Sequence, residues 1–474
     1  MRYLYLIHRW LGIAFCLLFA MWFATGMVMH FVAFPTLTAD ERFAGMTPIA
    51  TAQVHVSPEQ ARKTASAASI AQVRLAMRGE RPQYVFVQDS GLAAIYADSG
   101  EIAPPAVRDE ALRLALQHAH LRGLNVPRAD YAELATHDQW TVPNGLDPFR
   151  PLHRIRLHDD AGTELYVSAV TGEVVRDTTR FERGWNYAGA VVHWIYPTAL
   201  RKHWAAWDST VWWLSLTALA GAVTGLIVGV ARARWNHAAG LSPYRGMHYW
   251  HHMLGLVCAV FVLTYIFSGW LSMDHGRLFS KNAADPQEIA GLAGGTFETA
   301  RFGAVPLGQL QGAKEIEFAL LGGQPYLRAR FDAEKQLIVD RQRNAVAHFA
   351  PAAVTAAARP LLSGQCGTAE TVAADDAYYV APSGHNAPLY RLRCADARHT
   401  WIHVDSASGQ VIEQVDDSRR WYRWLYSALH TFDMPWLVAH PPLRTLLIVS
   451  LCLGGLLFSL TGVVIGWRRL KPRQ

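Results

Sequence analysis

Four stretches of the chain consist of apolar and small polar residues without a single Asp, Glu, Lys or Arg. They are Trp10–Phe34, Val211–Ala231, Met253–Met273 and Thr445–Trp467. A helix crosses the hydrocarbon core of a bilayer with about 20 such residues. The pattern predicts four transmembrane helices, which we place at residues 1–34, 208–231, 248–274 and 444–467. The first is too long for a signal peptide, whose apolar core has about 7–15 residues, so we expect a retained anchor.

The two long connections between these helices, residues 35–207 and 275–443, have the pattern of mixed helix and strand. Helical signals begin at Ser57-Pro58-Glu59 and at Arg108. Short runs of β-branched and aromatic residues, each followed by a turn with glycine, predict strands in hairpins. Such runs occur at Tyr84–Gln88, Leu152–His158 and Leu165–Ala169, and again within Lys314–Val339 and Leu389–Val415. We expect two α+β units in each connection, each with its helix covering one face of a sheet.

Charge gives these segments an orientation. The net charge is +6, yet residues 1–9, 232–247 and 468–474 hold nine Lys and Arg and no acidic residue. By the positive-inside rule, both termini, the 232–247 link and the 468–474 tail face the cytoplasm. The long connections are then expected in the periplasm of a bacterial inner membrane. What remains of the chain is slightly acidic, which argues against a nucleic-acid partner.

Composition excludes several classes of protein. Hydrophobic residues make up 51% and charged residues 17% of the chain, whereas an ordinary soluble domain has about 25% charged residues. A cytosolic enzyme, a secreted domain and a disordered protein are therefore excluded. Of the five cysteines, Cys366 and Cys394 share the second long connection, and the other three lie in spans. Because a periplasmic location is oxidising, we expect a disulfide between Cys366 and Cys394.

The sequence also repeats itself. His193 and Thr224-Gly225 recur as His430 and Thr461-Gly462, both 237 residues later, and Val167–Val174 resembles Val404–Val411 at the same offset. His8–Gly12 resembles His251–Gly255, and Thr25-Gly26 resembles Ser268-Gly269, both at an offset of 243. The chain therefore predicts two parallel repeats of span, external region and span. Such repeats are related by a pseudo-twofold axis along the membrane normal.

These motifs resemble the PepSY-associated transmembrane family, over nearly the full chain. They are His8–Gly12, Thr25-Gly26, Leu429-His430 with Val192-His193 in the first half, and Thr461-Gly462 through Arg468. The resemblance implies a four-span helical bundle with two periplasmic α+β PepSY-like regions. Some members are similar to iron-regulated inner-membrane proteins, among them haem-containing reductases of ferric siderophores. Others are described by fold alone, so the resemblance implies architecture more than chemistry.

The candidate chemistry rests on histidines at the ends of the spans. A haem in a helical bundle needs two imidazoles that face each other from different helices between apolar walls. Repeat symmetry predicts that His8 faces His251 on the inner side and that His193 faces His430 on the outer side. Two haem b groups, one above the other, would let electrons cross the bilayer. The competing interpretation is that each histidine anchors a helix end at the interface.

Three further histidines are reserve candidates. His30 follows His8 by 22 residues, about 33 Å along a helix, so it belongs to an outer site if it binds anything. Its repeat counterpart is Met273, so it either replaces one of the outer pair or bonds a neighbour. His252 stands where the first repeat has Arg9, and His275 lies off the helical face of His251. The sequence leaves the ligand pairing open.

The leading hypothesis is an inner-membrane dihaem oxidoreductase that passes electrons outward to a ferric siderophore or another ferric chelate. No nucleotide-binding motif is present and the cytoplasmic segments are short, so the donor is expected to be quinol or a separate cytoplasmic reductase. A zinc protease is disfavoured because the chain has no His-Glu-x-x-His. The alternative is a non-redox protein whose PepSY-like units bind a peptidase or receptor. A transporter is a third, but the spans contain no ionisable Asp, Glu, Lys or Arg to mark an ion pathway.

Overall fold

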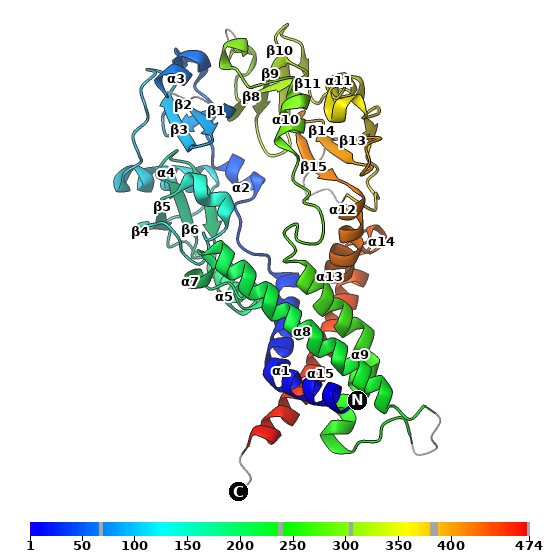
Figure 1. Ribbon diagram of the computed structural model, residues 1–474. Coiled ribbons are helices and arrows are strands. Elements are labelled where there is room, and N and C mark those ends of the chain that lie inside the picture. The colour runs from blue at the N-terminus through cyan, green and yellow to red at the C-terminus, as the bar shows by residue number, and fades with distance from the viewer. Residues whose placement is uncertain (66–69, 236–239, 303–306, 380–386, 472–474) are drawn as a thin grey trace.

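Four long helices form a bundle, and a sheet-rich part stands at one end of it (Figure 1). The computed structural model describes residues 1–65, 70–235, 240–302, 307–379 and 387–471. The long helices are α1 (Arg2–Phe31), α8 (Trp204–Arg232), α9 (Gly246–Leu271) and α15 (Pro441–Leu470). Each is long and apolar enough to cross a membrane. We call the bundle end next to the sheets the proximal end, and the other, where α1 begins and α15 ends, the distal end.

These helices match the four predicted spans but differ from them at the ends. α1 stops at Phe31, short of residue 34, since the chain turns extended ahead of Pro35. α15 begins at Pro441, ahead of residue 444, because proline is well tolerated in the first turn of a helix, where its missing N–H would have no partner. Residues 236–239 of the predicted link and 472–474 of the predicted tail lie outside the described residues.

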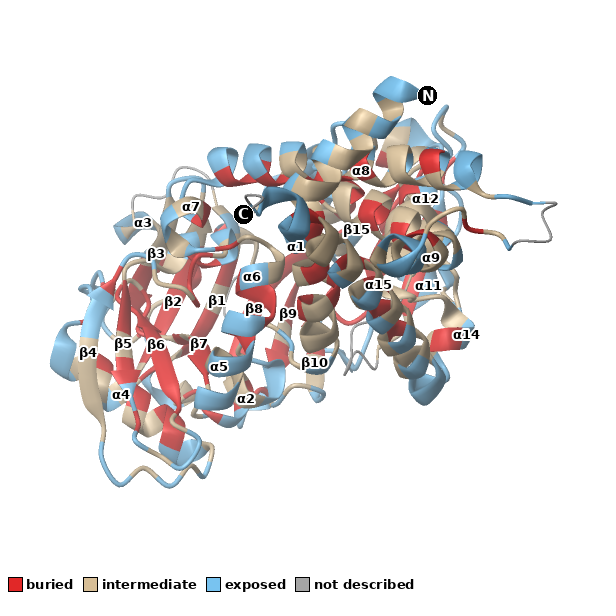
Figure 2. Cartoon of the chain, turned by 90° about the horizontal axis from the view of Figure 1, so that it is seen from below, coloured by how far each residue is buried: buried red, intermediate tan, exposed pale blue. Residues whose placement is uncertain are grey.

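The bundle packs around a small apolar core. α1 lies against α15 and α8, and α9 lies against α8 and α15. Phe23, Val262, Ile448 and Cys452 meet in the middle. A β-carbon on Gly455 would come within 2.7 Å of the Phe23 ring, so glycine is what lets α15 approach α1 here. The outward faces of the long helices are exposed (Figure 2) and carry large apolar side chains, as expected of surfaces that contact lipid.

The connection between α1 and α8 forms two units of helix and strands. The first has α2 (Ala39–Ala44), α3 (Pro58–Thr64), β1 (Ile70–Arg78), β2 (Arg81–Gln88) and β3 (Gly91–Tyr96). The second has α4 (Arg108–Leu121), β4 (Asp130–Ala135), β5 (Leu152–Arg156), β6 (Glu164–Ser168) and β7 (Val174–Thr178). As its sequence indicates, Ser57 caps α3 in a capping box with Gln60.

The connection between α9 and α15 repeats this order. Its first unit has α10 (Pro286–Ala293), β8 (Glu315–Leu321), β9 (Gln324–Arg330), β10 (Gln336–Asp340) and β11 (Ala345–Val346). Its second unit has α11 (Pro351–Ala357), β12 (Glu370–Thr371), β13 (Leu389–Arg393), β14 (Trp401–Asp405) and β15 (Val411–Val415). A disulfide joins Cys366 to Cys394 in this unit.

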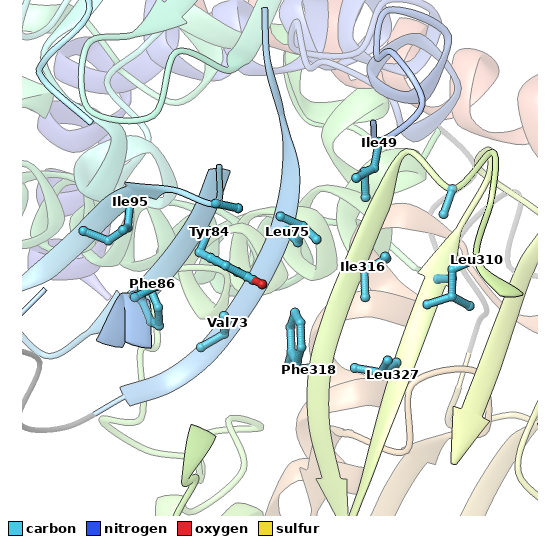
Figure 3. Close-up of a cluster of buried hydrophobic side chains, with 14 of the residues drawn as sticks. Ile49, Val73, Leu75, Tyr84, Phe86, Ile95, Leu310, Ile316, Phe318 and Leu327 are labelled. Carbon is cyan, nitrogen blue, oxygen red and sulfur yellow. The ribbon is translucent and has the colours of Figure 1, made fainter. Parts of the chain in front are cut away.

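The first units of the two connections share one sheet, a pairing that the sequence analysis did not address. β1 pairs with β8, which gives one seven-stranded sheet in the order β11-β10-β9-β8-β1-β2-β3. Val73 and Leu75 of β1 stand opposite Phe318 and Ile316 of β8, so the apolar core runs across the joint (Figure 3). The physical reason is that β1 and β8 would otherwise be edge strands with unpaired backbone groups. The second units keep four-stranded sheets of their own.

Four charged residues lie over this joint, and we call them the junction cluster. Glu315 opens β8, and its side chain is only 2% exposed. It pairs with Arg42 and, at 3.1 Å, with Arg74. Glu173, from the turn between β6 and β7, lies 2.5 Å from Arg74 and 3.5 Å from Arg42. The cluster thus ties together the two connections and the second unit of the first one.

Short helices link the sheets back to the bundle. On the first side these are α5 (Arg180–Ala188), α6 (Ala190–His193) and α7 (Thr198–Arg201). On the second side they are α12 (Asp417–Tyr422), a π-helix at Arg423–Ala428, α13 (Leu429–Thr431) and α14 (Pro435–Val438). α6 and α13 carry His193 and His430 to the proximal end of the bundle.

Candidate functional site

The structure brings the four principal candidate histidines together as two pairs. At the distal end, the rings of His8 on α1 and His251 on α9 have their centroids 6.4 Å apart and lie 30° from parallel. At the proximal end, the rings of His193 on α6 and His430 on α13 have the same separation, at 59°. All four side chains are half-buried. Each pair joins one residue from each half of the chain.

The separation of the rings leaves space for one metal ion between them. A metal lies about 2.0–2.1 Å from an imidazole nitrogen, which is itself about 1.1 Å from the ring centroid. Two imidazoles on opposite sides of one metal therefore have centroids about 6.2–6.4 Å apart. Direct packing of two rings face to face would bring them closer, within the lower part of the 4.5–7 Å range of aromatic pairs. The observed 6.4 Å in both pairs fits a shared axial metal.

Hydrogen bonds fix which nitrogen of each ring carries the proton. Nδ1 of His193 lies 2.9 Å from the Thr25 hydroxyl, Nδ1 of His251 lies 2.9 Å from that of Thr461, and Nδ1 of His430 lies 3.1 Å from that of Ser268. Each hydroxyl also has a carbonyl of its own helix within hydrogen-bond distance, so it can donate there while it accepts from the Nδ1–H of the ring.

His8 also hydrogen-bonds through Nδ1, but to a backbone carbonyl and not to a hydroxyl. Its Nδ1 lies 3.3 Å from the carbonyl oxygen of Gly221, which can only accept. The Thr224 hydroxyl bonds to the carbonyls of Ala220 and Gly221 and not to the ring. The network is satisfied in all four rings when the proton is on Nδ1, and Nε2 then keeps its lone pair, the arrangement typical of metal-bound histidine.

The repeated Thr-Gly and Ser-Gly motifs have a second role, which is steric. In each motif the glycine that follows the hydroxyl residue lies against the edge of one histidine ring. A β-carbon on Gly225 would come within 2.7 Å of His8 Cε1, and on Gly269 within 3.4 Å of His430 Cε1. The corresponding distances are 3.5 Å from Gly26 to His193 and 3.6 Å from Gly462 to His251. Only at Gly225 would a β-carbon clash with the ring edge, and at the other three positions it would make an ordinary van der Waals contact.

A cavity of about 470 Å³ surrounds the distal pair between the four long helices. Ligand pockets in proteins are typically about 300–1,000 Å³. Its walls are mainly apolar, and Phe458 stacks on His251 with centroids 4.9 Å apart. Seven glycines reduce side-chain bulk along it, namely Gly12, Gly221, Gly225, Gly229, Gly255, Gly462 and Gly466. The cavity has the size and polarity to admit a flat apolar macrocycle.

The proximal pair has aromatic neighbours that the sequence did not reveal. Tyr265 and Tyr426 have ring centroids 5.6 and 5.7 Å from that of His430. Tyr426 lies in the π-helix at Arg423–Ala428, a rare element that often marks functional sites. On the other side, the indole N–H of Trp22 donates to the carbonyl oxygen of His193 at 3.0 Å. No sequence signal separates a π-helix from an α-helix here.

Comparison with known proteins bears on the whole chain. The family model described as the PepSY-associated TM region matches residues 5–469. The chain belongs to the PepSY-associated transmembrane family. No curated protein matches it.

The reserve histidines of this PepSY-associated protein each have a protein partner, and His252 also lines the distal cavity. Nε2 of His30 lies 2.9 Å from the Thr445 hydroxyl, which is the neighbour bond that the sequence left open. His252 has both ring nitrogens in hydrogen bonds, Nδ1 to Ser242 and Nε2 to the carbonyl of Gly229, each at 2.9 Å. His275 pairs with Asp208 and packs on Trp204. Within the described part of the chain, none of the three faces another histidine.

Proposed function

We propose that this protein is a dihaem b-type cytochrome of the bacterial inner membrane, with His8 and His251 holding a distal haem and His193 and His430 a proximal one. The observation that carries the proposal is that the four histidine rings have the same spacing and the same hydrogen-bonding pattern. They form two pairs at 6.4 Å, and each keeps Nε2 free by bonding through Nδ1. Bound haem iron would supply one-electron redox chemistry at each end of the bundle.

The donor set agrees with haem in particular. A haem iron takes four ligands from the porphyrin and needs only two from the protein. Among the residues that the structure describes, no three His, Cys, Asp or Glu side chains are grouped to hold a metal by themselves. At the distal pair, two imidazoles face an apolar, glycine-lined cavity of the kind that an iron porphyrin requires, whereas a zinc or calcium ion would need more protein ligands.

The proposed direction of electron flow follows from charge. The nine basic residues of segments 1–9, 232–247 and 468–474 place the distal end in the cytoplasm by the positive-inside rule. The sheet-rich part then lies in the periplasm beside the proximal pair. Electrons from quinol or a cytoplasmic reductase would enter at the distal end and leave at the proximal end. We infer that the acceptor is a ferric siderophore or similar chelate, because hard oxygen donors hold Fe(III) better than Fe(II) and reduction releases the metal.

An absorption spectrum tests the cofactor. We expect the purified protein to show a Soret band, sharpened on reduction with dithionite, and a pyridine haemochrome content of about two haem b per chain. Anaerobic addition of a ferric hydroxamate, with a trap for Fe(II), should reoxidise the reduced protein and release the trapped metal. Protein without iron porphyrin would overturn the proposal and leave a binding or regulatory role. Haem without chelate reduction would overturn only the acceptor.

The Thr461 hydroxyl offers a test of how the distal ligand is positioned. Thr461→Val keeps the shape of the side chain but removes the acceptor for the His251 Nδ1 proton. Loss of such an outer hydrogen bond typically weakens a metal site about 10–100-fold. We expect faster loss of the distal haem to a haem-scavenging protein, with the proximal haem unchanged. Thr217→Val is the matched control, since that hydroxyl bonds only the Trp213 carbonyl of its own helix.

A further inference from the structure

The distal cavity ends in arginines that have no carboxylate partner. Its lining includes Arg9, Arg232, Arg468 and Arg469. Among the described residues none of the four forms an ion pair, whereas Arg42, Arg74, Arg122 and Arg391 in the sheets all do. The sequence at this end explains why, because segments 1–9, 232–247 and 468–474 contain no Asp or Glu. The described residues therefore supply no counter-charge to these arginines.

Arg9 is half-buried, its guanidinium lies 5.4 Å from the centroid of the Trp10 ring, and one of its nitrogens is buried without a hydrogen-bond partner. Nε of Arg9 is shielded from solvent and makes no hydrogen bond to any described residue. An unsatisfied guanidinium N–H of this kind is costly to leave unpaired. Arg9 follows His8 in the chain, so its guanidinium is tethered next to the distal pair. Its burial beside the cavity points to an acceptor within the cavity.

The cavity is also polarised along the bundle axis. Toward its proximal end it is lined by Phe19, Ala259, Val262 and Leu263, and toward its distal end by Arg232, Arg468 and Arg469, while Arg9 stands next to His8 on α1. From Gly462, which packs on His251, to Arg468 and Arg469 is six to seven residues, or about 9–10 Å along a helix. A ligand centred between His8 and His251 would thus have apolar side chains on its proximal side. On its distal side it would have cations about two helical turns away along α15.

We propose that the distal cavity binds its macrocycle in one orientation, with two carboxylates directed to the distal end and held by Arg9, Arg232, Arg468 and Arg469. This rests on the proposed function. His8 on α1 and His251 on α9 would hold the macrocycle from two helices of the bundle, next to the arginines of the same cavity. Carboxylates at its other edge would lie in an apolar, uncharged interior, which is strongly unfavourable. The arginines therefore act as the carboxylate-binding subsite and set the orientation.

The test compares two ligands that differ only in these carboxylates. Protein made under haem limitation is loaded with ferric protoporphyrin IX or with its dimethyl ester, in the His193→Ala background to isolate the distal site. We expect the ester to bind about tenfold more weakly or worse. Arg468→Gln with Arg469→Gln should narrow this difference. Arg234→Gln is the control, since it removes a cation from the same end of the bundle but not from the cavity lining.

A second measurement uses the full chain with its native haems, in case the histidine variant fails to fold. Nearby positive charge favours the reduced form of a haem over the oxidised form. Removing the two cations should therefore lower the midpoint potential of the distal haem. Repeating both measurements in bilayer discs of phosphatidylcholine, with and without phosphatidylglycerol, tests whether an anionic lipid headgroup is the real partner. Equal binding of acid and ester, or an effect of the arginines only with phosphatidylglycerol, would overturn the inference while leaving the haem proposal intact.

Discussion

Replacing His251 with alanine is expected to lower the haem content from about two to about one per chain, because an iron held by His8 alone loses one axial ligand. The remaining haem should be the proximal one. Its spectrum after dithionite should be that of a six-coordinate haem b, since His193 and His430 are not touched. Electron transfer from a donor at the distal end should be abolished, while the proximal haem stays reducible by dithionite from solution. Haem content and reduced-minus-oxidised spectra measure both effects.

The pairing itself is tested by comparing single and double variants. His8→Ala should resemble His251→Ala, and the double variant should lose no more haem than either alone, because both residues serve one site. Combining His251→Ala with His193→Ala should remove both haems. His252→Ala is the control beside His251, since both of its ring nitrogens already bond to protein. Loss of a haem from His252→Ala, or two haems retained in His251→Ala, would show that the ligand assignment is wrong.

Much of the helical part could be predicted because its signals are local or repeated. A span is visible in the sequence as a run of residues without charge. The repeat offsets of 237 and 243 identify His8, His251, His193 and His430 from the sequence alone. The structure then places these residues in two facing pairs. What the repeat could not show is the hydrogen bond behind each motif. The Thr-Gly motif recurs in the sequence, but its contacts differ between copies. Only the structure shows that Thr25 and Thr461 hydrogen-bond to a histidine ring whereas Thr224 bonds to a backbone carbonyl.

The sheet-rich part was harder to predict because its decisive contacts join residues far apart in the chain. Strand periodicity predicts that β1 and β8 exist and which face is apolar, but both could equally be edges of separate sheets. Their pairing, at Val73 with Phe318, depends on two segments about 240 residues apart. The same limit applies to His30 and His275, whose partners Thr445 and Asp208 lie in other spans or at their ends.

Replacing Glu315 with alanine is expected to destabilise the sheet-rich part by about 3–5 kcal/mol, the usual effect of breaking a buried ion pair. Burial alone would raise the pKa of Glu315, but the charges of Arg42, Arg74 and Arg330 outweigh it and lower the pKa to about 2. Without Glu315, Arg42 and Arg74 would share only Glu173. Because the cluster lies over the β1–β8 joint, the loss should fall on the contact between the two connections.

Hydrogen exchange of the β1 and β8 amides, together with thermal unfolding, measures this effect. The folded pKa of Glu315 lies below its ordinary value of 4.5, so its contribution is present above pH 4.5 and is lost as the pH falls toward 2. The wild-type protein should lose stability over this range more steeply than Glu315→Ala. Arg128→Gln, which breaks an exposed pair with Asp130, should change little. Within the cluster, the pair of Arg74 with Glu315 is the one that joins β1 to β8 directly. If the β1 and β8 amides exchange as slowly in Glu315→Ala as in the wild type, the prediction is wrong, and backbone pairing with the Val73–Phe318 packing holds the joint without the ion pairs.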